Sequence, residues 1–240
     1  MIHIWLRTDL DWTDEAAFLA QCPHAFRPRV ELWNATFSVP FHVFRGRVAE
    51  IARASRDAVQ GATISTDWEE IPDGAVVLPV DDDDWFAPDV ATTLEREWDG
   101  RGGCSWTASF VEVPLNWRHA VGWAARRRLP RIPLKYRCIT NNYALVKQPG
   151  RRGTAASHVA ATEWFERHAL PQLPARLSAM NRTLASQTSL GGSGPAPSRA
   201  ALLRRYERYR RLYREPLDTP AWCAPHLARM AELMDELELR

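Results

Sequence analysis

Four consecutive aspartates follow a short apolar run in the first half of the chain. Residues 75–80 read Ala-Val-Val-Leu-Pro-Val, residues 81–84 are all aspartate, and residues 85–88 read Trp-Phe-Ala-Pro. Carboxylate oxygens are hard ligands, and Mg²⁺ or Mn²⁺ binds one or two of them together with substrate phosphates. Adjacent carboxylates also repel one another unless a cation neutralises them. The aspartates therefore predict a cation site, and a solvated acidic turn is the alternative.

The flanking residues predict where this acidic loop lies. The uninterrupted apolar run at residues 75–80 is typical of a strand that is buried on both faces of a parallel sheet. Pro88 and Asp89 are suited to the first turn of a helix over residues 90–99. We therefore expect the loop at the carboxyl end of a central strand, the edge where open α/β sheets bind ligands.

The remaining pattern predicts an alternating α/β fold with a mostly parallel central sheet flanked by helices. Apolar residues recur at helical spacing over residues 47–59, for example at Val48, Ile51, Ala52 and Val59. We expect strands at residues 2–6, 29–33, 75–80, 105–111 and 136–146, and helices at residues 14–20, 47–59 and 90–99.

The acidic stretch resembles the metal-binding DxD stretch of GT-A glycosyltransferases, which use nucleotide-sugar donors. Val80, the four aspartates and Trp-Phe-Ala-Pro fit the pattern apolar-Asp-x-Asp-Asp-x-x-x-Pro. The resemblance is most specific over residues 71–94, looser over residues 1–165 and absent beyond about residue 190. A fainter likeness is to bacterial rhamnosyltransferases. The resemblance implies a GT-A-like, Rossmann-like sheet, to which the C-terminal helices would be an appendage.

The resemblance also implies roles for the residues of the loop. Asp81 and Asp83 would hold Mn²⁺ or Mg²⁺, which bridges the two phosphates of the donor. Asp82 would lie in the donor site, and Asp84 would orient the loop or bind a hydroxyl of the ribose or sugar. Trp85 is the aromatic residue that we expect to stack on a sugar ring.

Further candidates lie outside the loop. Arg7 and Asp9 follow the first expected strand, where Arg7 would meet a phosphate and Asp9 a base or ribose; a salt bridge in a turn is the alternative. We assign Arg53, in the helix at residues 47–59, to the donor's phosphates, and a position on a solvated helix face is the alternative.

A second group of candidates follows the Gly-Arg-Arg-Gly at residues 150–153. The resemblance implies a metal ligand or an acidic base near the start of the next helix, which here holds His158 and Glu163. The Glu-Asp pair usual in the family is missing. His158 is therefore a metal ligand, a base or a structural residue, and Glu163 is a candidate base for an inverting transfer.

Composition limits the class of protein. The chain has 240 residues, 45 % of them apolar, and a net charge of +2, so no overall positive field favours nucleic acid. Four cysteines are scattered singly, which predicts buried, reduced thiols. The chain shows no signal peptide and no apolar stretch of membrane-spanning length. We expect a soluble cytoplasmic protein, with peripheral contact to the inner membrane face left open.

The C-terminal part differs in character. Residues 183–198 are rich in Gly, Ser, Thr and Pro and predict a flexible loop, which separates a domain at residues 1–182 from helices in residues 199–240. Residues 199–214 hold seven arginines and one glutamate, whereas residues 226–239 are acidic. We expect these two amphipathic helices to pair, within one chain or across a homodimer. Contact of the basic helix with an anionic membrane surface or with nucleic acid is the alternative.

These observations predict a metal-dependent hexosyltransferase. It would move a sugar from a nucleotide-diphosphate sugar to a hydroxyl of a glycan or lipid-linked acceptor. A nucleotidyltransferase is one alternative, although residues 7–10, Arg-Thr-Asp-Leu, lack the expected Gly-rich phosphate loop with lysine. The other is a non-catalytic module on the same fold that binds a cation and a partner.

Overall fold

The computed structural model describes residues 1–7, 11–22, 26–107, 109–110, 138, 141–150, 158–181, 183–184, 196–215 and 219–240. For residues 109–110 and 158–159 it describes the backbone alone. Asp9 and most of the expected flexible loop at residues 183–198 therefore lie outside the described residues.

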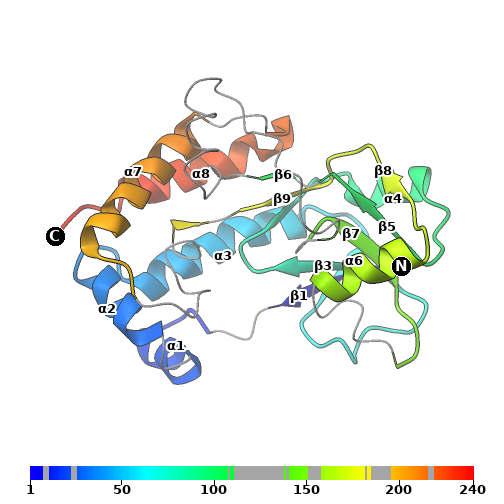
Figure 1. Cartoon of the computed structure of the whole chain (residues 1–240), viewed down its shortest axis with the longest axis horizontal. Helices are drawn as coiled ribbons and strands as arrows, with labels where there is room; N and C mark the ends of the chain where they lie inside the picture. The colour runs from blue at the N-terminus through cyan, green and yellow to red at the C-terminus, as the bar shows by residue number, and fades with distance from the viewer. Residues whose placement is uncertain are drawn as a thin grey trace.

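A six-stranded sheet forms one half of the molecule (Figure 1). Its strand order is β2-β1-β3-β7-β5-β8. The strands are β1 (Ile2–Arg7), β2 (Ala62–Ser65), β3 (Val76–Asp81), β5 (Gly103–Trp106), β7 (Tyr143–Val146) and β8 (Gln172–Leu173). Of these six, β7 runs antiparallel to its neighbours β3 and β5, and the other pairs are parallel. The predicted α/β class with a mostly parallel sheet is confirmed.

The order of the strands reverses between β1 and β3. The chain goes from β1 to β2 on one side of β1 and then crosses to β3 on its other side. In open α/β sheets the carboxyl ends of the strands at such a reversal leave a crevice, and ligands bind there.

Helices cover both faces of the sheet. On one face, Ile4, Leu78 and Val80 form a core with residues of α4 (Val90–Glu97). On the other face, Trp5 and Val77 form a core with residues of α6 (His158–Arg167). Alternate residues of a strand point to opposite faces, so Arg7 lies on the same side of β1 as Trp5.

Helices form the other half, on the left of Figure 1. These are α1 (Glu15–Gln21), α2 (Arg27–Asn34), α3 (Phe41–Asp57), α7 (Arg199–Arg214) and α8 (Ala224–Asp235), with a short 3₁₀ turn η4 (Ala221–Cys223) before α8. They share one apolar core. The predicted pairing of the two C-terminal helices occurs within the chain, where Arg210 and Arg214 of α7 form ion pairs with Asp235 of α8.

A three-stranded sheet joins the two halves. It contains β4 (Trp85–Phe86), β9 (Ser178–Met180) and β6 (Ser109–Phe110), in the order β4-β9-β6. Trp85 and Ala179, which are paired in this sheet, belong to the core of the helical half. The segment after the four aspartates is therefore fixed to the helices.

Three predicted strands were wrong in type or extent. The strand expected at residues 136–146 begins only at Tyr143, and residues 136–137 and 139–140 lie outside the described part of the chain. Residues 29–33 lie in helix α2, where Pro28 is in the first turn and Val30 and Trp33 are buried at helical spacing. The alternation of polar and apolar residues there fits either structure. The strand expected at residues 105–111 divides into β5 and β6, which belong to different sheets.

The predicted state of the thiols is confirmed. Cys22, Cys104, Cys138 and Cys223 are all buried, and none of them is in a disulfide bond. In the part of the chain that the structure describes, no helix is both long and apolar enough to cross a membrane.

Candidate functional site

The four aspartates form a tight turn at the carboxyl end of β3. Asp81 is the last residue of the strand, and the backbone N–H of Asp84 donates to the carbonyl of Asp81 at 3.2 Å. Asp81 lies opposite Arg7, the last residue of β1, in the register of the two parallel strands. The loop therefore lies at the carboxyl edge of the sheet where the strand order reverses, the position that the sequence predicted for it.

On the outer side of this loop, Asp81 pairs with Arg7 of β1. The Arg7 guanidinium contacts the Asp81 carboxylate at 2.9 Å, and the exposed fractions of the two side chains are 17 % and 36 %. This is the salt bridge that the sequence left open as an alternative role for Arg7. Both side chains remain partly accessible at the edge of the sheet.

The inner side consists of Asp82 and Asp83, which share one arginine from α3. Arg45 donates to Asp82 at 2.9 Å through Nη2 and to Asp83 at 3.0 Å through Nη1. The indole Nε1 of Trp12 also donates to Asp82, at 3.0 Å, and its ring lies 5.1 Å from the Arg45 guanidinium carbon. All three charged side chains are buried.

Burial and mutual repulsion set the charge of this inner cluster. Burial raises the pKa of Asp83 to about 6, because the repulsion from Asp82 and Asp81 adds to the desolvation and Arg45 offsets only part of it. Burial lowers the pKa of Arg45, but Asp83 and Asp82 outweigh that effect and hold the pKa above its usual value. Arg45 is therefore a permanent cation, and Asp83 carries a proton below about pH 6.

Asp84 fastens the loop to the helical half. It is buried, and its Oδ1 accepts a hydrogen bond from the backbone N–H of Asn181 at 2.9 Å. The Tyr213 hydroxyl on α7 donates to the side-chain oxygen of Asn181 at 3.0 Å. Of the two roles expected for Asp84, these contacts correspond to orienting the loop.

The four aspartates of the loop differ in whether they could bind a metal ion. Asp81 contacts Arg7 at the sheet edge, whereas Asp83 contacts Arg45 in the interior. Among the described residues, no three His, Cys, Asp or Glu side chains group in a way that could hold a metal ion. The described side chains therefore do not form a complete metal site, and a cation at Asp81 would need most of its ligands from water or from a bound molecule.

The other predicted residues lie on three further elements, β4, α3 and α6. Trp85 is fully buried, and its ring lies 5.1 Å from that of His226, so its surroundings are those of a core residue and speak against stacking on a sugar. Arg53 and Glu163 are exposed on α3 and α6. His158 is the first residue of α6, and its side chain lies outside the described part.

Sequence reasoning missed the arginines that hold the loop. Arg45 and Arg56 are buried on α3, and Arg56 donates to the backbone carbonyl of Asp82 at 3.4 Å. Burial lowers the pKa of Arg56, and the negative charge of Asp82 offsets part of this effect. A signal existed, since both arginines fall on the helical stripe that the buried residues Phe41, Phe44, Val48, Ala52 and Ser55 define.

Tyr143 was also missed. It begins β7 beside the crevice, is 0 % exposed, and its hydroxyl has no hydrogen-bond partner among the described residues. Burial raises the pKa of Tyr143, and Arg7 and Asp81 are among the charged groups that act on it. Its ring packs edge-on against Phe165 at 5.7 Å.

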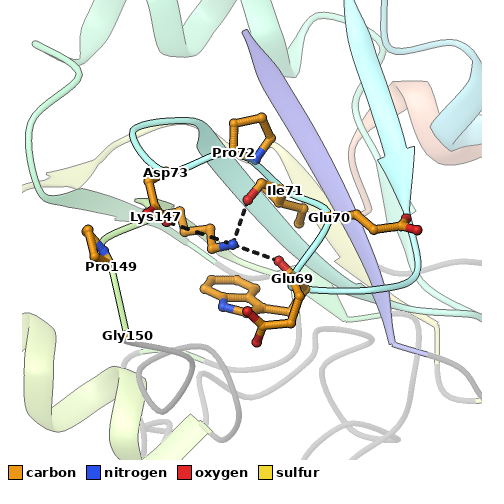
Figure 2. A pocket seen from close by; sticks show the side chains of 9 residues that line it. Glu69, Glu70, Ile71, Pro72, Asp73, Lys147, Pro149 and Gly150 are labelled. Carbon is orange, nitrogen blue, oxygen red and sulfur yellow. Dashed lines mark hydrogen bonds and ion pairs between the residues drawn. The ribbon is translucent and has the colours of Figure 1, made fainter.

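A pocket of about 430 Å³ lies elsewhere (Figure 2). It is lined by residues 68–73 and by Lys147, Pro149 and Gly150, next to the amino end of β3. Figure 2 shows Lys147 pointing toward the surrounding loop, where it donates to the carbonyls of Trp68 at 2.9 Å and Ile71 at 2.5 Å. These bonds give Lys147 a structural role in closing the loop, so we place the candidate site at the opposite edge.

Comparison of the chain with protein-family models, with curated proteins and with solved structures found no match.

Proposed function

We propose that the chain is a glycosyltransferase of the GT-A kind, which moves a sugar from a nucleotide-diphosphate sugar to a hydroxyl of a glycan or lipid-linked acceptor. One observation carries this proposal: an aspartate loop lies at the carboxyl edge of the sheet where the strand order reverses, and Arg7 lies opposite Asp81. This is the edge at which open α/β sheets bind nucleotides.

The chemistry of the transfer suits this edge. When the glycosidic bond breaks, negative charge grows on the leaving nucleoside diphosphate, and cationic groups fixed beforehand stabilise it. Arg7 is such a group, held in place by Asp81 at 2.9 Å. Asp81 is the residue that would hold Mn²⁺ or Mg²⁺ with the phosphates, and the cation would supply further stabilisation of the leaving group.

The buried aspartates serve a different purpose in this proposal. Asp82, Asp83 and Asp84 are bound by Arg45 and by the backbone of Asn181, so the turn cannot easily change shape. A rigid turn keeps Asp81 and Arg7 in position before substrate arrives, which reduces the reorganisation needed for reaction. For an inverting reaction, His158 and Glu163 of α6 remain the two candidates for the base that deprotonates the acceptor hydroxyl.

A non-catalytic module that binds a cation and a partner is the second candidate. The observation that favours it is that all four carboxylates are bound within the protein, Asp81 by Arg7 and the other three by Arg45 and Asn181. Such a loop is first a structural feature, and the partly exposed carboxylate of Asp81 can bind a cation without any transfer.

Turnover separates the two candidates. The chain is incubated with Mn²⁺, a mixture of glycan acceptors, and sugars linked to UDP, GDP or dTDP, and release of the nucleoside diphosphate is measured. We expect release from one donor class, lowered about 100-fold in Asp81→Asn, the range typical for removal of one preorganised charged contact. Arg47→Met, on the exposed side of α3, is the control and should keep the wild-type rate. No release from any donor would favour the non-catalytic module.

A further inference from the structure

The buried hydroxyl of Tyr143 is the polar group beside the site that most needs an explanation. Buried polar groups in proteins are nearly always hydrogen-bonded, and an exception often marks a place for a ligand or a water molecule. Tyr143 is 0 % exposed, and its hydroxyl finds no partner among the described residues.

The sheet places Tyr143 on the same face as Arg7 and Asp81, near the edge where these two residues pair. Strand β7 pairs antiparallel with β3, with Leu145 opposite Val77, so Tyr143 lies two residues further toward the carboxyl end of β3. Val77 and Asp81 are on one face of β3, and Tyr143 and Leu145 are on the same face of β7. Burial raises the pKa of the Tyr143 hydroxyl, Arg7 lowers it and Asp81 raises it further, so both of these charges act on the hydroxyl.

Helix α6 begins at the same edge and covers the same face. Near its C-terminal end, the ring of Phe165 packs so closely on Gly103, the first residue of β5, that a Cβ there would lie 2.9 Å from it. Leu170, which follows α6, similarly lies against Gly102. The helix therefore ends near the amino edge of the sheet. Its N-terminus, about 10 Å before Phe165, points to the carboxyl edge.

These three features favour one class of ligand. A guanidinium binds phosphate through paired N–H donors, a neutral phenol donates to a phosphate oxygen, and a helix N-terminus attracts anions. Asp81 opposes an anion, but Arg7 at 2.9 Å offsets its charge, and a divalent cation would do so further.

We propose that the Tyr143 hydroxyl donates a hydrogen bond to a phosphate oxygen of the donor's diphosphate, beside Arg7 and the first turn of α6. This inference rests on the proposed function, because it takes the ligand to be a nucleoside diphosphate. It adds a phosphate-binding residue that lies on the antiparallel strand β7, outside the acidic loop.

Calorimetric titration of wild type and Tyr143→Phe with inorganic pyrophosphate, UDP, GDP and the matching nucleosides, all with Mn²⁺, tests the proposal. We expect Tyr143→Phe to bind pyrophosphate and the preferred nucleoside diphosphate about tenfold more weakly, because a bond to a charged group is lost. Binding of the nucleoside should not change. Tyr206→Phe, in the core of the helical half, is the matched control and should bind like wild type.

Thermal unfolding distinguishes a binding role from a structural one. Because the hydroxyl lacks a described partner, its removal should leave the Tm unchanged or raise it. A lower Tm with unchanged pyrophosphate affinity would overturn the proposal, and so would weakened binding of the nucleoside alone. If wild type bound neither pyrophosphate nor any nucleoside diphosphate, both this inference and the proposed nucleotide-sugar donor would be overturned. A tenfold loss in Tyr143→Phe without sugar transfer by wild type would support the phosphate site and reject the transferase.

Discussion

Asp81 and Asp82 are neighbours in the sequence but belong to two different regions of the molecule. Asp81 ends β3 at the sheet edge and pairs with Arg7, where both side chains are partly exposed. Asp82 and Asp83, one and two residues later, are buried against Arg45 of α3. A run of identical charges can therefore combine a surface site with a buried ion cluster, and the turn after the strand decides which carboxylate joins which.

The two regions should differ in what they contribute to stability. An ion pair between partly exposed side chains contributes at most about 1 kcal/mol. A buried cluster can itself contribute little, but removal of one partner leaves an uncompensated buried charge and costs about 3–5 kcal/mol. Loss of the Asp81–Arg7 pair should therefore cost little stability, whereas Asp82, Asp83 and Arg45 are required for the shape of the loop.

The largest effect should come from breaking the inner region. Arg45→Met leaves Asp82 and Asp83 buried without their shared cation, and we expect the free energy of unfolding to fall by about 3–5 kcal/mol. Arg47→Met, two residues along the same helix, removes an exposed pair with Glu236 and should change it by less than about 1 kcal/mol. Urea unfolding of both variants measures the contrast. Equal losses would show that Arg45 is not the centre of a buried cluster.

The outer region can be tested through binding. Asp81→Asn should weaken Mn²⁺-dependent binding of the nucleoside diphosphate about tenfold or more, while the free energy of unfolding changes by less than about 1 kcal/mol. Asp83→Asn should bind like wild type, because Asp83 contacts Arg45 in the interior. Calorimetric titration and urea unfolding give both quantities.

Equal loss of metal-dependent binding in the two variants would contradict this division. It would mean that Asp81 and Asp83 share a cation, as the resemblance to the DxD stretch implies, and that Arg45 releases Asp83 when the ligand binds.

The sequence predicted the parts of the fold that depend on local pattern. The buried strand before the aspartates and the two C-terminal helices were each visible as a run or a period of apolar residues, and the structure has them as β3, α7 and α8. Residues 29–33 failed because so short a segment fits a strand or a helix equally well.

The division of the acidic loop could not be predicted in the same way. It depends on the approach of Arg45, which is 38 residues from Asp83, and on the register that places Arg7 opposite Asp81. The position of Arg45 on the apolar stripe of α3 indicated that it is buried, but not which acid it meets. Tyr143 reaches the site only because the antiparallel strand β7 lies next to β3, a pairing that no local pattern encodes.

A third predicted effect concerns the charge of the inner cluster. The pKa of Asp83 is raised from 3.8 to about 6, so between these values the folded protein keeps a proton that the unfolded chain has lost. The folded state then binds more protons than the unfolded state, and this group stabilises the protein increasingly as the pH falls from about 6 toward 4, opposite to the usual carboxylate.

Asp83→Asn cannot take up this proton. The free energy of unfolding of wild type minus that of the variant should therefore rise on acidification, by at most about 1.4 kcal/mol per pH unit. Burial lowers the pKa of His3 and of His226, which has the opposite effect, but both proteins contain these histidines and the difference cancels them. A difference that stays flat or falls between pH 6.5 and 4.5 would mean that Arg45 keeps both aspartates ionised, and the inner region would then resemble the outer one in charge while differing from it only in burial.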